Sequence, residues 1–514
     1  MINSPCILRP TASPARPKPD IAAFAAALQN HNLVPVHRTM LADLDTPLSL
    51  FAKIAENSEQ VFLFESMEGG EKWGRYSFIG FDPLITFTSQ GPHYRIAYPG
   101  LAGMAPVERD GNPFQALREL MRSFRVAKPD DTAMLPRFYG GLVGYLGYDM
   151  VRFVEKLPDR HPMQDMPDSA LFIPRILLIH DHLKQLLRVV CTVWLPETSG
   201  LDATALHAQA CSRIDAVCAQ LRGPVPAGLC RHEPAAKHVF HSSAGPGGYR
   251  KMVERAQKYV LAGDVIQVVL SQRFEAEAHV TPFAVYRALR HVNPSPYLFF
   301  LRQSGITLIG SSPEILVRLE EERITVRPIA GTRKRGRTAE EDQELERELR
   351  ADEKERAEHL MLVDLGRNDV GRVATPGTVQ VQELLVVERY SHVMHLVSGV
   401  EGRLAPGKDQ FDVFAASFPA GTVSGAPKIR AMEIIDELEC CRRGPYAGAV
   451  GYFGFSGNMD FCIALRTCVH TGKTLWVQAG AGIVADSDPE REHEETVNKS
   501  MAIRKAVELV EQEL

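Results

Sequence analysis

Hydrophobic and polar positions follow different periods along the chain and predict a mixture of helices and strands. Residues 249–260 place apolar side chains about every 3.6 positions, which predicts an amphipathic helix. Residues 264–273 are rich in β-branched side chains and predict a buried strand. Ser487-Asp488-Pro489 has the signature of a helix N-terminus, with proline at the first helical position. Helical and strand patterns mix without a regular βαβ rhythm, so we expect an α+β (mixed α/β) fold and not a doubly wound parallel sheet.

Two glycine-rich segments in the two halves of the chain resemble each other. Residues 140–148 (GGLVGYLGY) and 447–455 (AGAVGYFGF) share three glycines, a valine and a tyrosine at equivalent positions. Glycine inside a strand permits close backbone approach or a bulge. The similarity indicates an old duplication, two sheets packed alike, or a chance likeness of glycine- and aromatic-rich strands.

Proline and glycine clusters divide the chain. The segment 223–248 predicts a linker between an N-terminal region, 31–222, and a C-terminal region, 249–514. Five prolines and no apolar core in the first twenty residues argue against a signal peptide, and residues 1–30 are predicted to be a flexible tail.

Composition narrows the class of protein. The chain has 514 residues, of which 45% are hydrophobic and 24% charged, values typical of a globular protein that needs no disulfides. A net charge of −5 argues against nucleic-acid binding, and no apolar run approaches the ~20 residues of a membrane span. Nine cysteines without a C-x-x-C motif predict reduced thiols in a cytoplasmic protein and argue against a zinc site.

Motifs for several common chemistries are missing. The chain has no G-x-x-x-x-G-K-[ST], no G-x-G-x-x-G after a strand, no H-E-x-x-H and no G-x-S-x-G. ATP hydrolysis, hydride transfer and serine hydrolysis are therefore disfavoured. Residues 338–358 mix acidic and basic side chains and are best interpreted as a solvated charged helix.

Acidic side chains on two predicted helices suggest a cation site. Glu492, Glu495 and Lys499 share one helix face, and Glu358 begins an apolar stretch where a carboxylate is poorly hydrated. Carboxylate oxygens are ligands that Mg²⁺ prefers, so Glu358 and Glu495 are candidate ligands. The alternative is an ordinary solvated helix face.

An arginine and a glycine pair suggest an anionic substrate. Arg466 stands within a predicted apolar strand, 462–468, where its planar guanidinium suits a carboxylate. Gly480-Ala481-Gly482 follows an apolar strand, and a turn there would form a backbone nest for an anion. A buried ion pair and a structural turn are the alternatives.

Five ordered motifs resemble the chorismate-utilising enzymes, and most closely their anthranilate synthase component I group. The resemblance spans about 45–510 and implies a two-layered fold with large packed β-sheets and helices outside. It also implies chorismate and Mg²⁺ in a cleft and conversion of chorismate to anthranilate and pyruvate, the first step of tryptophan biosynthesis. The motifs are 328–332 (PIAGT), 358–369 (EHLMLVDLGRND), 390–397 (YSHVMHLV), 420–428 (AGTVSGAPK) and 478–482 (QAGAG).

The resemblance assigns roles residue by residue. Glu314 is similar to the family's general acid, which protonates the departing C4 hydroxyl, and His395 to the base of the later elimination. Gln267 and Thr422 are the other implied catalytic residues, and Glu358 and Glu495 look like the Mg²⁺ ligands. The implied chorismate contacts are Gly331, Thr332, Tyr446, Arg466, Gly480, Ala481, Gly482 and Lys499.

Two positions favour ammonia as the nucleophile. Relatives that add water place lysine where this chain has Gln267, and those that form aminodeoxychorismate place lysine where it has Ala330. Ammonia already has a free lone pair and needs no base to activate it. The alternatives are an aminodeoxychorismate- or isochorismate-forming relative, and an inactive tryptophan-sensing module, which is expected to lack one of the acids.

The resemblance also implies two binding partners. No G-x-C-x-G elbow occurs, so ammonia is expected from a separate glutamine amidotransferase subunit, in a heterodimer or a heterotetramer. The segments 62–66 (FLFES) and 293–299 (NPSPYLF) resemble the family's tryptophan site, where the end product inhibits. The implied inhibitor contacts are Glu65, Ser66, Pro296, Tyr297 and Leu298.

Overall fold

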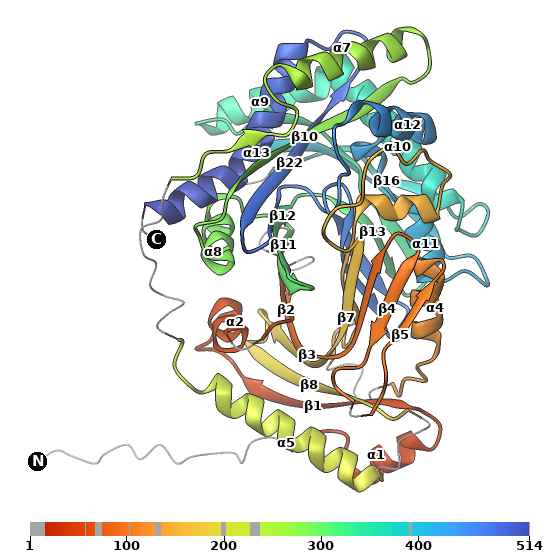
Figure 1. Ribbon diagram of the computed structural model, residues 1–514, viewed down its shortest axis with the longest axis vertical. Coiled ribbons are helices and arrows are strands. Elements are labelled where there is room, and N and C mark those ends of the chain that lie inside the picture. Colours follow the sequence, from red (N-terminus) through yellow and green to blue (C-terminus); the bar gives the residue numbers. More distant parts are fainter. Residues whose placement is uncertain are drawn as a thin grey trace, which may run out of the picture.

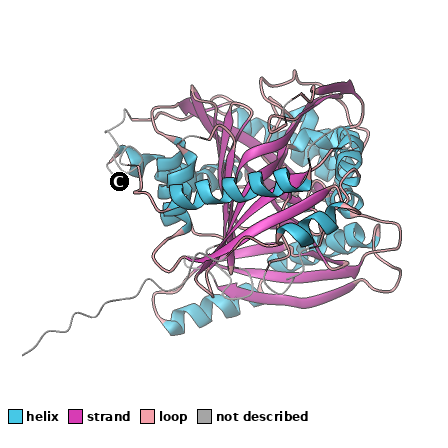
Figure 2. Cartoon of the chain, turned by 90° about the horizontal axis from the view of Figure 1, so that it is seen from below, coloured by secondary structure: helices cyan, strands magenta, loops and turns pink. Residues whose placement is uncertain are grey.

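The computed structural model describes residues 16–56, 58–66, 74–101, 103–128, 135–196, 202–226, 237–389 and 393–512. Its described strands form one 22-stranded sheet, and every pairing between named strands is antiparallel. The sheet curls on itself, with helices on its outer side (Figure 1; Figure 2 gives the view from below).

Two long strands form the base of the sheet. β3 (Tyr76–Gln90) and β7 (Ser169–Asp181) pair over most of their length, and every residue of β7 is buried. The base continues through β8 (Leu186–Trp194) to β1 (Leu33–Leu41) on one side, and through β4 (His93–Ala97) to β5 (Val107–Asp110) on the other.

Two arms of strands rise from this base. The first arm runs β2 (Val61–Glu65), β11 (Tyr297–Gln303), β12 (Ile306–Ser312), β21 (Thr467–His470), β22 (Thr474–Ile483) and β10 (Gln267–Glu277), with β9 (His241–Ser242) and β18 (Gly425–Ala426) on β10. The second runs β6 (Gly141–Leu146), β19 (Ala449–Gly454), β20 (Met459–Ile463), β13 (Ile315–Glu320), β14 (Arg323–Val326) and β17 (Val393–Arg403), which pairs with β15 (Ile329–Lys334) and β16 (Gln380–Arg389).

Helices cover the outer faces. Against the base lie α1 (Ile21–Leu28), α2 (Pro47–Ala55) and α5 (Ala203–Leu221), and against the first arm α7 (Gly248–Leu261), α8 (Pro282–Val292), α12 (Lys428–Leu438) and α13 (Pro489–Glu511). Against the second arm lie α9 (Ala339–Ala351), α10 (Glu353–Gly371) and α11 (Gln410–Ser417). The remaining described helices are α4 (Pro113–Arg122) and the short η1 (Tyr148–Phe153) and η2 (Gly421–Val423).

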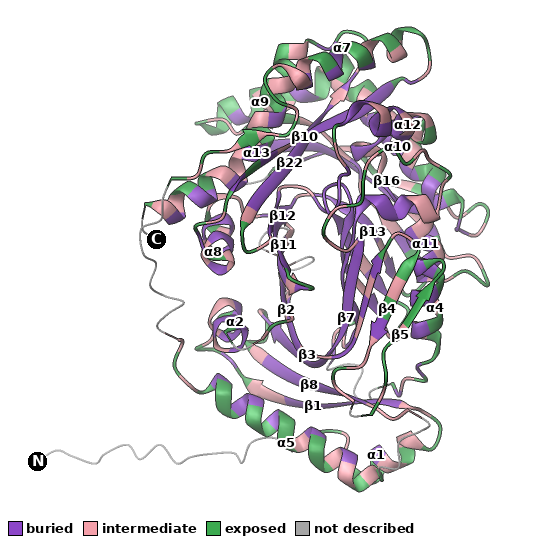
Figure 3. Cartoon of the chain, in the orientation of Figure 1, coloured by how far each residue is buried: buried purple, intermediate pink, exposed green. Residues whose placement is uncertain are grey.

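The core lies between the arms and beneath the helices. One apolar cluster joins Phe62 and Trp476 of the first arm to Phe172 of the base and Val450 of the second arm. Two larger clusters pack the outer helices onto the sheet, so central strands such as β7, β6 and β12 are buried on both faces, whereas β5 and β16 are largely exposed (Figure 3). The predicted α+β fold with helices outside is confirmed, and the packed β-layers are the two arms of one curled sheet.

The two similar glycine-rich segments are neighbouring strands. β6 and β19 pair with each other, and Gly144 lies opposite Gly451. A Cβ atom on Gly144 would stand 2.1 Å from the carbonyl oxygen of Ala170, and one on Gly451 would stand 2.0 Å from that of Asp460. Each glycine therefore allows the same close approach to the next strand, which gives the likeness a physical cause.

The two sequence regions share one sheet. β2 of the N-terminal region pairs with β11 of the C-terminal region, and β6 pairs with β19. The prediction of a flexible tail is wrong for residues 21–28, because α1 lies there and buries Phe24 completely. The prediction rested on prolines, but the alanine-rich stretch after Asp20, which caps α1, forms the helix. Residues 1–15, and 227–236 of the predicted linker, lie outside the described residues.

Other local predictions hold with shifted ends. The helix predicted at 249–260 is α7, and Asp488 caps α13 by accepting the Arg491 N–H. The strand predicted at 264–273 is β10, which starts three residues later at Gln267. The charged segment 338–358 is split at Asp352, which ends α9 and caps α10. Within the described residues, no helix has the length and apolarity needed to cross a membrane.

Candidate active site

Glu314 is a buried carboxyl group between two strands. It lies in the short connection from β12 to β13, and the Thr422 hydroxyl donates to its Oε1 at 2.9 Å. Burial raises its pKa to about 7, although the Thr422 hydrogen bond and the positive charges of Lys499 and Arg466 favour the ionised form. A carboxyl group with this pKa can hold and release a proton near neutral pH, as a general acid must.

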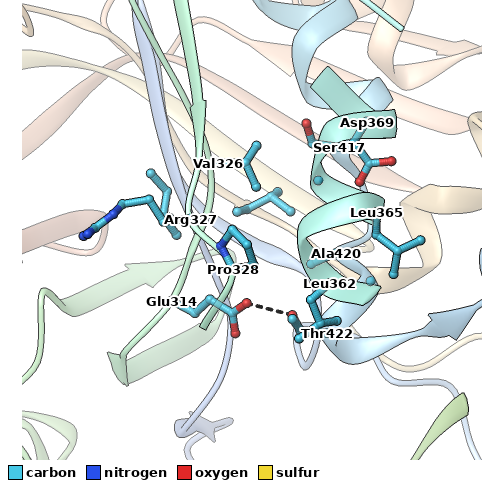
Figure 4. A pocket seen from close by; sticks show the side chains of 14 residues that line it. Glu314, Val326, Arg327, Pro328, Leu362, Leu365, Asp369, Ser417, Ala420 and Thr422 are labelled. Atoms are coloured by element: carbon cyan, nitrogen blue, oxygen red, sulfur yellow. Dashed lines mark hydrogen bonds between the residues drawn. The ribbon is translucent and has the colours of Figure 1, made fainter. Parts of the chain in front are cut away.

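The walls around Glu314 explain its burial. They include Leu316, Pro328, Leu362 and Leu365, which enclose a cavity of about 30 Å³ between β13 and α10 (Figure 4). That volume holds roughly one or two waters. Few dipoles are therefore available to solvate a carboxylate there.

His395 is held by a bulge in the neighbouring strand. The pairing of β15 with β17 slips between Ala330 and Thr332, where Gly331 has φ +63°. His395 Nδ1 lies 3.0 Å from the carbonyl oxygen of Gly331 and 3.1 Å from Thr332 Oγ1. Because a carbonyl oxygen only accepts, Nδ1 carries the proton and Nε2 carries the basic lone pair. Burial lowers the pKa of His395 and so favours this neutral form.

Arg466 adopts a backbone conformation that the sequence did not predict. The predicted continuous strand is interrupted: β20 ends at Ile463, β21 begins at Thr467, and Arg466 between them has φ +46°. Positive φ is rare for arginine and costs about 1–3 kcal/mol where the surroundings impose it. Its positive charge acts on both Glu314 and His395, so all three side chains belong to one site.

The segment Gly480–Gly482 lies inside β22 and forms no turn. The predicted anion nest is therefore wrong, because these residues pair with β10 as regular strand. The glycines leave space for neighbouring side chains instead. A Cβ on Gly480 would stand 2.7 Å from the Tyr446 hydroxyl, and one on Gly482 2.2 Å from Gln267 Nε2. Ala481 lies between them with its side chain in the core under α7 and α12.

Gln267 and Glu358 are joined directly. Gln267 is the first residue of β10, and its Nε2 donates to Glu358 Oε1 of α10 at 3.1 Å. Gln267 is buried and Glu358 half-buried. The first arm and the helix that covers the second arm thus meet at this hydrogen bond.

Lys499 links α13 to the same region. Its Nζ lies 2.7 Å from Glu495 Oε1 and donates to the Gly480 carbonyl at 3.0 Å. Its charge also reaches Glu314. The structure therefore brings Glu495 and Lys499 beside β22, as an ion pair one helical turn apart.

Two further glutamates lie beside the candidate metal ligands. Glu355 is one turn before Glu358, and burial and the Glu358 charge raise its pKa against the effect of Arg333. Glu492 is three residues before Glu495, and burial raises its pKa despite Lys499 and Lys354, with the Glu495 charge acting in the same direction. The two glutamates of each pair are three residues apart, so the sequence alone places them on one face of a helix.

This surplus of carboxylates fits a bound cation. In the described part of the chain no three His, Cys, Asp or Glu side chains already stand in a metal-binding arrangement. Two pairs of glutamates nevertheless place carboxyl groups close enough to influence each other, Glu355 with Glu358 on α10 and Glu492 with Glu495 on α13. Oxygen donors of this kind suit Mg²⁺, which usually retains several waters.

The residues proposed for inhibitor binding are gathered around the end of β2. Glu65 ends β2 opposite Leu298 of β11, and Ser66 follows it. Glu65 Oε2 accepts hydrogen bonds from the Tyr286 hydroxyl at 2.6 Å and from Arg290 Nε at 3.2 Å. Tyr286 and Arg290 of α8 were not predicted as site residues, because no sequence pattern shows that they lie next to Glu65.

Tyr297 and Leu298, two of the implied inhibitor contacts, do not share one surface. Successive strand residues point to opposite faces of the sheet. Leu298 packs in the core beneath α8, whereas Tyr297 packs between the arms, with its hydroxyl donating to Asp460 Oδ1 at 2.8 Å. Pro296 precedes the strand and is half-buried. Of the motif 390–397, residues 390–392 lie outside the described residues.

Comparison of the sequence with known proteins identifies the family of this chain. The family model for chorismate binding enzymes matches residues 60–505. Anthranilate synthase component 1 of Cereibacter sphaeroides is 50% identical over 477 residues, 92% of this chain and 94% of the relative, and that of Aquifex aeolicus is 48% identical over 485 residues, 94% and 96%.

Solved structures agree with the sequence comparison. Anthranilate synthase component I from Streptococcus pneumoniae has a TM-score of 0.71 and 37% identity, covering 85% of this chain and 95% of that one. The isochorismate synthase MenF from Escherichia coli, at 21% identity, has the same fold with a TM-score of 0.69 over 95% and 98%. The chain belongs to the chorismate-binding enzymes, in the group of anthranilate synthase component 1.

Proposed function

We propose that the chain converts chorismate and ammonia to anthranilate, pyruvate and water. The observation that carries the proposal is Glu314, a buried acid with a pKa of about 7 that shares its site with His395, Arg466 and Lys499. The names of the relatives support the same reaction.

Each step has a residue suited to it. Protonated Glu314 donates to the C4 hydroxyl, which leaves as water while ammonia attacks C2 with its free lone pair. His395 then takes the C2 proton on Nε2, which allows pyruvate to leave and the ring to become aromatic. Arg466 and Lys499 hold the substrate carboxylates. Mg²⁺, held by Glu358 and Glu495, would supply charge neutralisation for a carboxylate.

Gln267 and Ala330 disfavour the reactions of the isochorismate- and aminodeoxychorismate-forming relatives. Gln267 is an amide that donates to Glu358 and cannot deprotonate water. Ala330 pairs with Leu396 and offers no nucleophile for covalent attack on the ring. An inactive sensor is disfavoured because Glu314, Glu358 and Glu495 are all present.

We propose that ammonia comes from a separate glutamine amidotransferase subunit. No G-x-C-x-G nucleophile elbow occurs in the sequence, and the relatives are named as a first component. The seven described cysteines are free thiols, which supports a cytoplasmic location.

The chain alone is expected to form anthranilate from chorismate, Mg²⁺ and an ammonium salt. Activity at fixed total ammonium should rise from pH 7 to mildly alkaline pH as free ammonia increases. Fluorescence of anthranilate measures the reaction. Glutamine should replace ammonium only after the amidotransferase subunit is added, and equal activity with glutamine alone would refute the proposed division between subunits.

His395→Met is expected to impair elimination more than amination. The variant lacks the Nε2 lone pair that takes the C2 proton, so an aminated, non-aromatic intermediate should accumulate. Chromatography of quenched reactions measures it. If the variant mixture contains only chorismate and anthranilate, the base is another group.

We propose that tryptophan inhibits by binding near Glu65 and Ser66. Glu65 is a buried carboxylate suited to an ammonium group, and Ser66 can share one hydrogen bond with an amino-acid ligand. Inhibition requires that tryptophan bind the inactive state better than the active one, with a typical coupling of ~1–3 kcal/mol.

Ser66→Arg is expected to relieve tryptophan inhibition with little change in uninhibited turnover. The arginine is too large for the site and carries a charge beside the ion pair of buried Glu65 with half-buried Arg290. Titration of activity with tryptophan measures the effect, with Ser66→Ala as the matched control that keeps the volume small. Undiminished inhibition in the arginine variant would remove Ser66 from the site.

A further inference from the structure

Two adjacent cysteines lie in the loop that follows α12. Cys440 is exposed and Cys441 half-buried, whereas four of the other described cysteines are buried. The loop begins at Glu439, the C-cap of α12, and continues into Arg442 and Arg443. The catalytic steps proposed above use neither thiol.

The surroundings of Cys440 favour its thiolate. Its Sγ lies 3.5 Å from Ser243 Oγ, to which the Cys440 thiol donates, and the same oxygen accepts the Arg273 N–H at 3.1 Å. Interaction with the neighbouring Cys441 thiol, together with Ser243, lowers the pKa of Cys440 against the effects of burial and the Glu439 charge. The interaction between the two thiols raises the pKa of Cys441. Cys440 is thus the nucleophile of the pair and Cys441 the protonated neighbour.

The residue before Cys440 anchors a buried network. Glu439 Oε1 accepts the Ser271 N–H and hydroxyl, each at 2.7 Å, and Arg443 Nη2 at 2.6 Å. Arg443 also donates to the carbonyls of Val269 at 2.7 Å and Val423 at 2.6 Å.

This network lies next to residues of the candidate active site. Val423 follows Thr422, which holds Glu314, and Val269 stands two residues after Gln267 on β10. Both Arg443 and Glu439 are buried. A displaced Cys440–Arg443 backbone therefore removes hydrogen bonds next to two catalytic positions.

A bond between the two sulfurs would displace that backbone. Neighbouring Cα atoms are about 3.8 Å apart, below the ~4.4–6.8 Å typical of disulfides. The resulting ring is strained, and strained disulfides are readily reduced again.

We propose that Cys440 is a site of oxidation by hydroperoxides, with Cys441 as the resolving thiol. The thiolate attacks the peroxide; the S–O bond forms as the O–O bond breaks, and the departing oxygen takes up a proton. Cys441 then attacks the sulfenic sulfur; the S–S bond forms, the S–O bond breaks, and hydroxide leaves as water with the Cys441 proton. The two thiols lose two electrons to the hydroperoxide, and the disulfide loosens the Glu439–Arg443 network.

The chemistry is tested by mass spectrometry after treatment of the full chain with hydrogen peroxide. The tryptic peptide 431–442 contains both cysteines and is expected to lose two hydrogens. In Cys441→Ser, dimedone should label Cys440 as the sulfenic acid. In Cys440→Ser, Cys441 should remain unlabelled. Labelling of Cys441 there, or two alkylatable thiols in the oxidised wild type, would overturn the assignment.

The link to the network is tested by hydrogen exchange. The Ser271 amide, held by Glu439, is expected to exchange at least tenfold faster after oxidation and to recover with dithiothreitol. Cys211→Ser should respond like the wild type, and the Cys440→Ser, Cys441→Ser double variant should not respond. Unchanged exchange in the oxidised wild type would refute the link. These measurements do not depend on the reaction catalysed, so they remain decisive if the proposed function fails.

Discussion

Glu314→Gln is expected to lower turnover by about 10²–10⁴-fold, the usual contribution of a general acid. The amide keeps the size of the side chain and can still bind the Thr422 hydroxyl, but it cannot protonate the C4 hydroxyl. Rates of anthranilate formation, expressed per concentration of free ammonia, should fall above pH 7 in the wild type as Glu314 ionises. The variant should lack this decrease.

The same substitution is expected to stabilise the folded chain at alkaline pH. The pKa of Glu314 is raised from 4.5 to about 7 by burial, so the folded state favours the protonated form. The protonated Glu314 side chain makes its full contribution to the free energy of unfolding below pH 4.5. That contribution is lost as the pH rises through 7 and the side chain ionises. The ionised form therefore costs about 3 kcal/mol at pH 8, from 1.36 kcal/mol per pKa unit. Thermal unfolding should place Glu314→Gln above the wild type at pH 8 and level with it near pH 4.5; equal stability at pH 8 would refute the raised pKa.

Periodicity predicted those parts of the fold that depend on local sequence. The helices α7 and α13 carry their own start signals and apolar faces, and β10 carries a β-branched run. The order of the strands depends instead on contacts between distant segments. The likeness of β6 and β19 was visible in the sequence, but that the two strands pair with each other was not.

Site residues were predicted better than their conformations. Arg466 was expected in a regular strand, yet its positive φ is imposed by the junction of β20 and β21 and by packing that no local pattern encodes. Gly480 and Gly482 were expected to form a turn because glycine often does. Their actual role depends on Tyr446 and Gln267, which fill the space where Cβ atoms would stand.

Contacts between distant segments could not be predicted from the sequence. The Gln267–Glu358 hydrogen bond joins residues 91 positions apart, and the Thr422–Glu314 bond joins residues 108 apart. Each pair lies on different elements of the curled sheet and its helices. Resemblance to a family identified these residues, and only the fold explains why they act together.

Glu358→Gln is expected to reduce turnover by on the order of 100-fold or more and to weaken Mg²⁺ binding in parallel. Glu358 is half-buried, accepts the Gln267 amide and adds its charge to that of Glu355, so the neutral amide removes negative charge where a cation is expected. Mg²⁺ should raise the unfolding temperature of the wild type, because a ligand that binds only the folded state stabilises it, and this rise should be lost in the variant. Glu494→Gln, an exposed neighbour of Glu495 on α13, is the matched control and should behave like the wild type. Normal turnover of Glu358→Gln in buffer treated with a chelator would exclude Glu358 as a metal ligand.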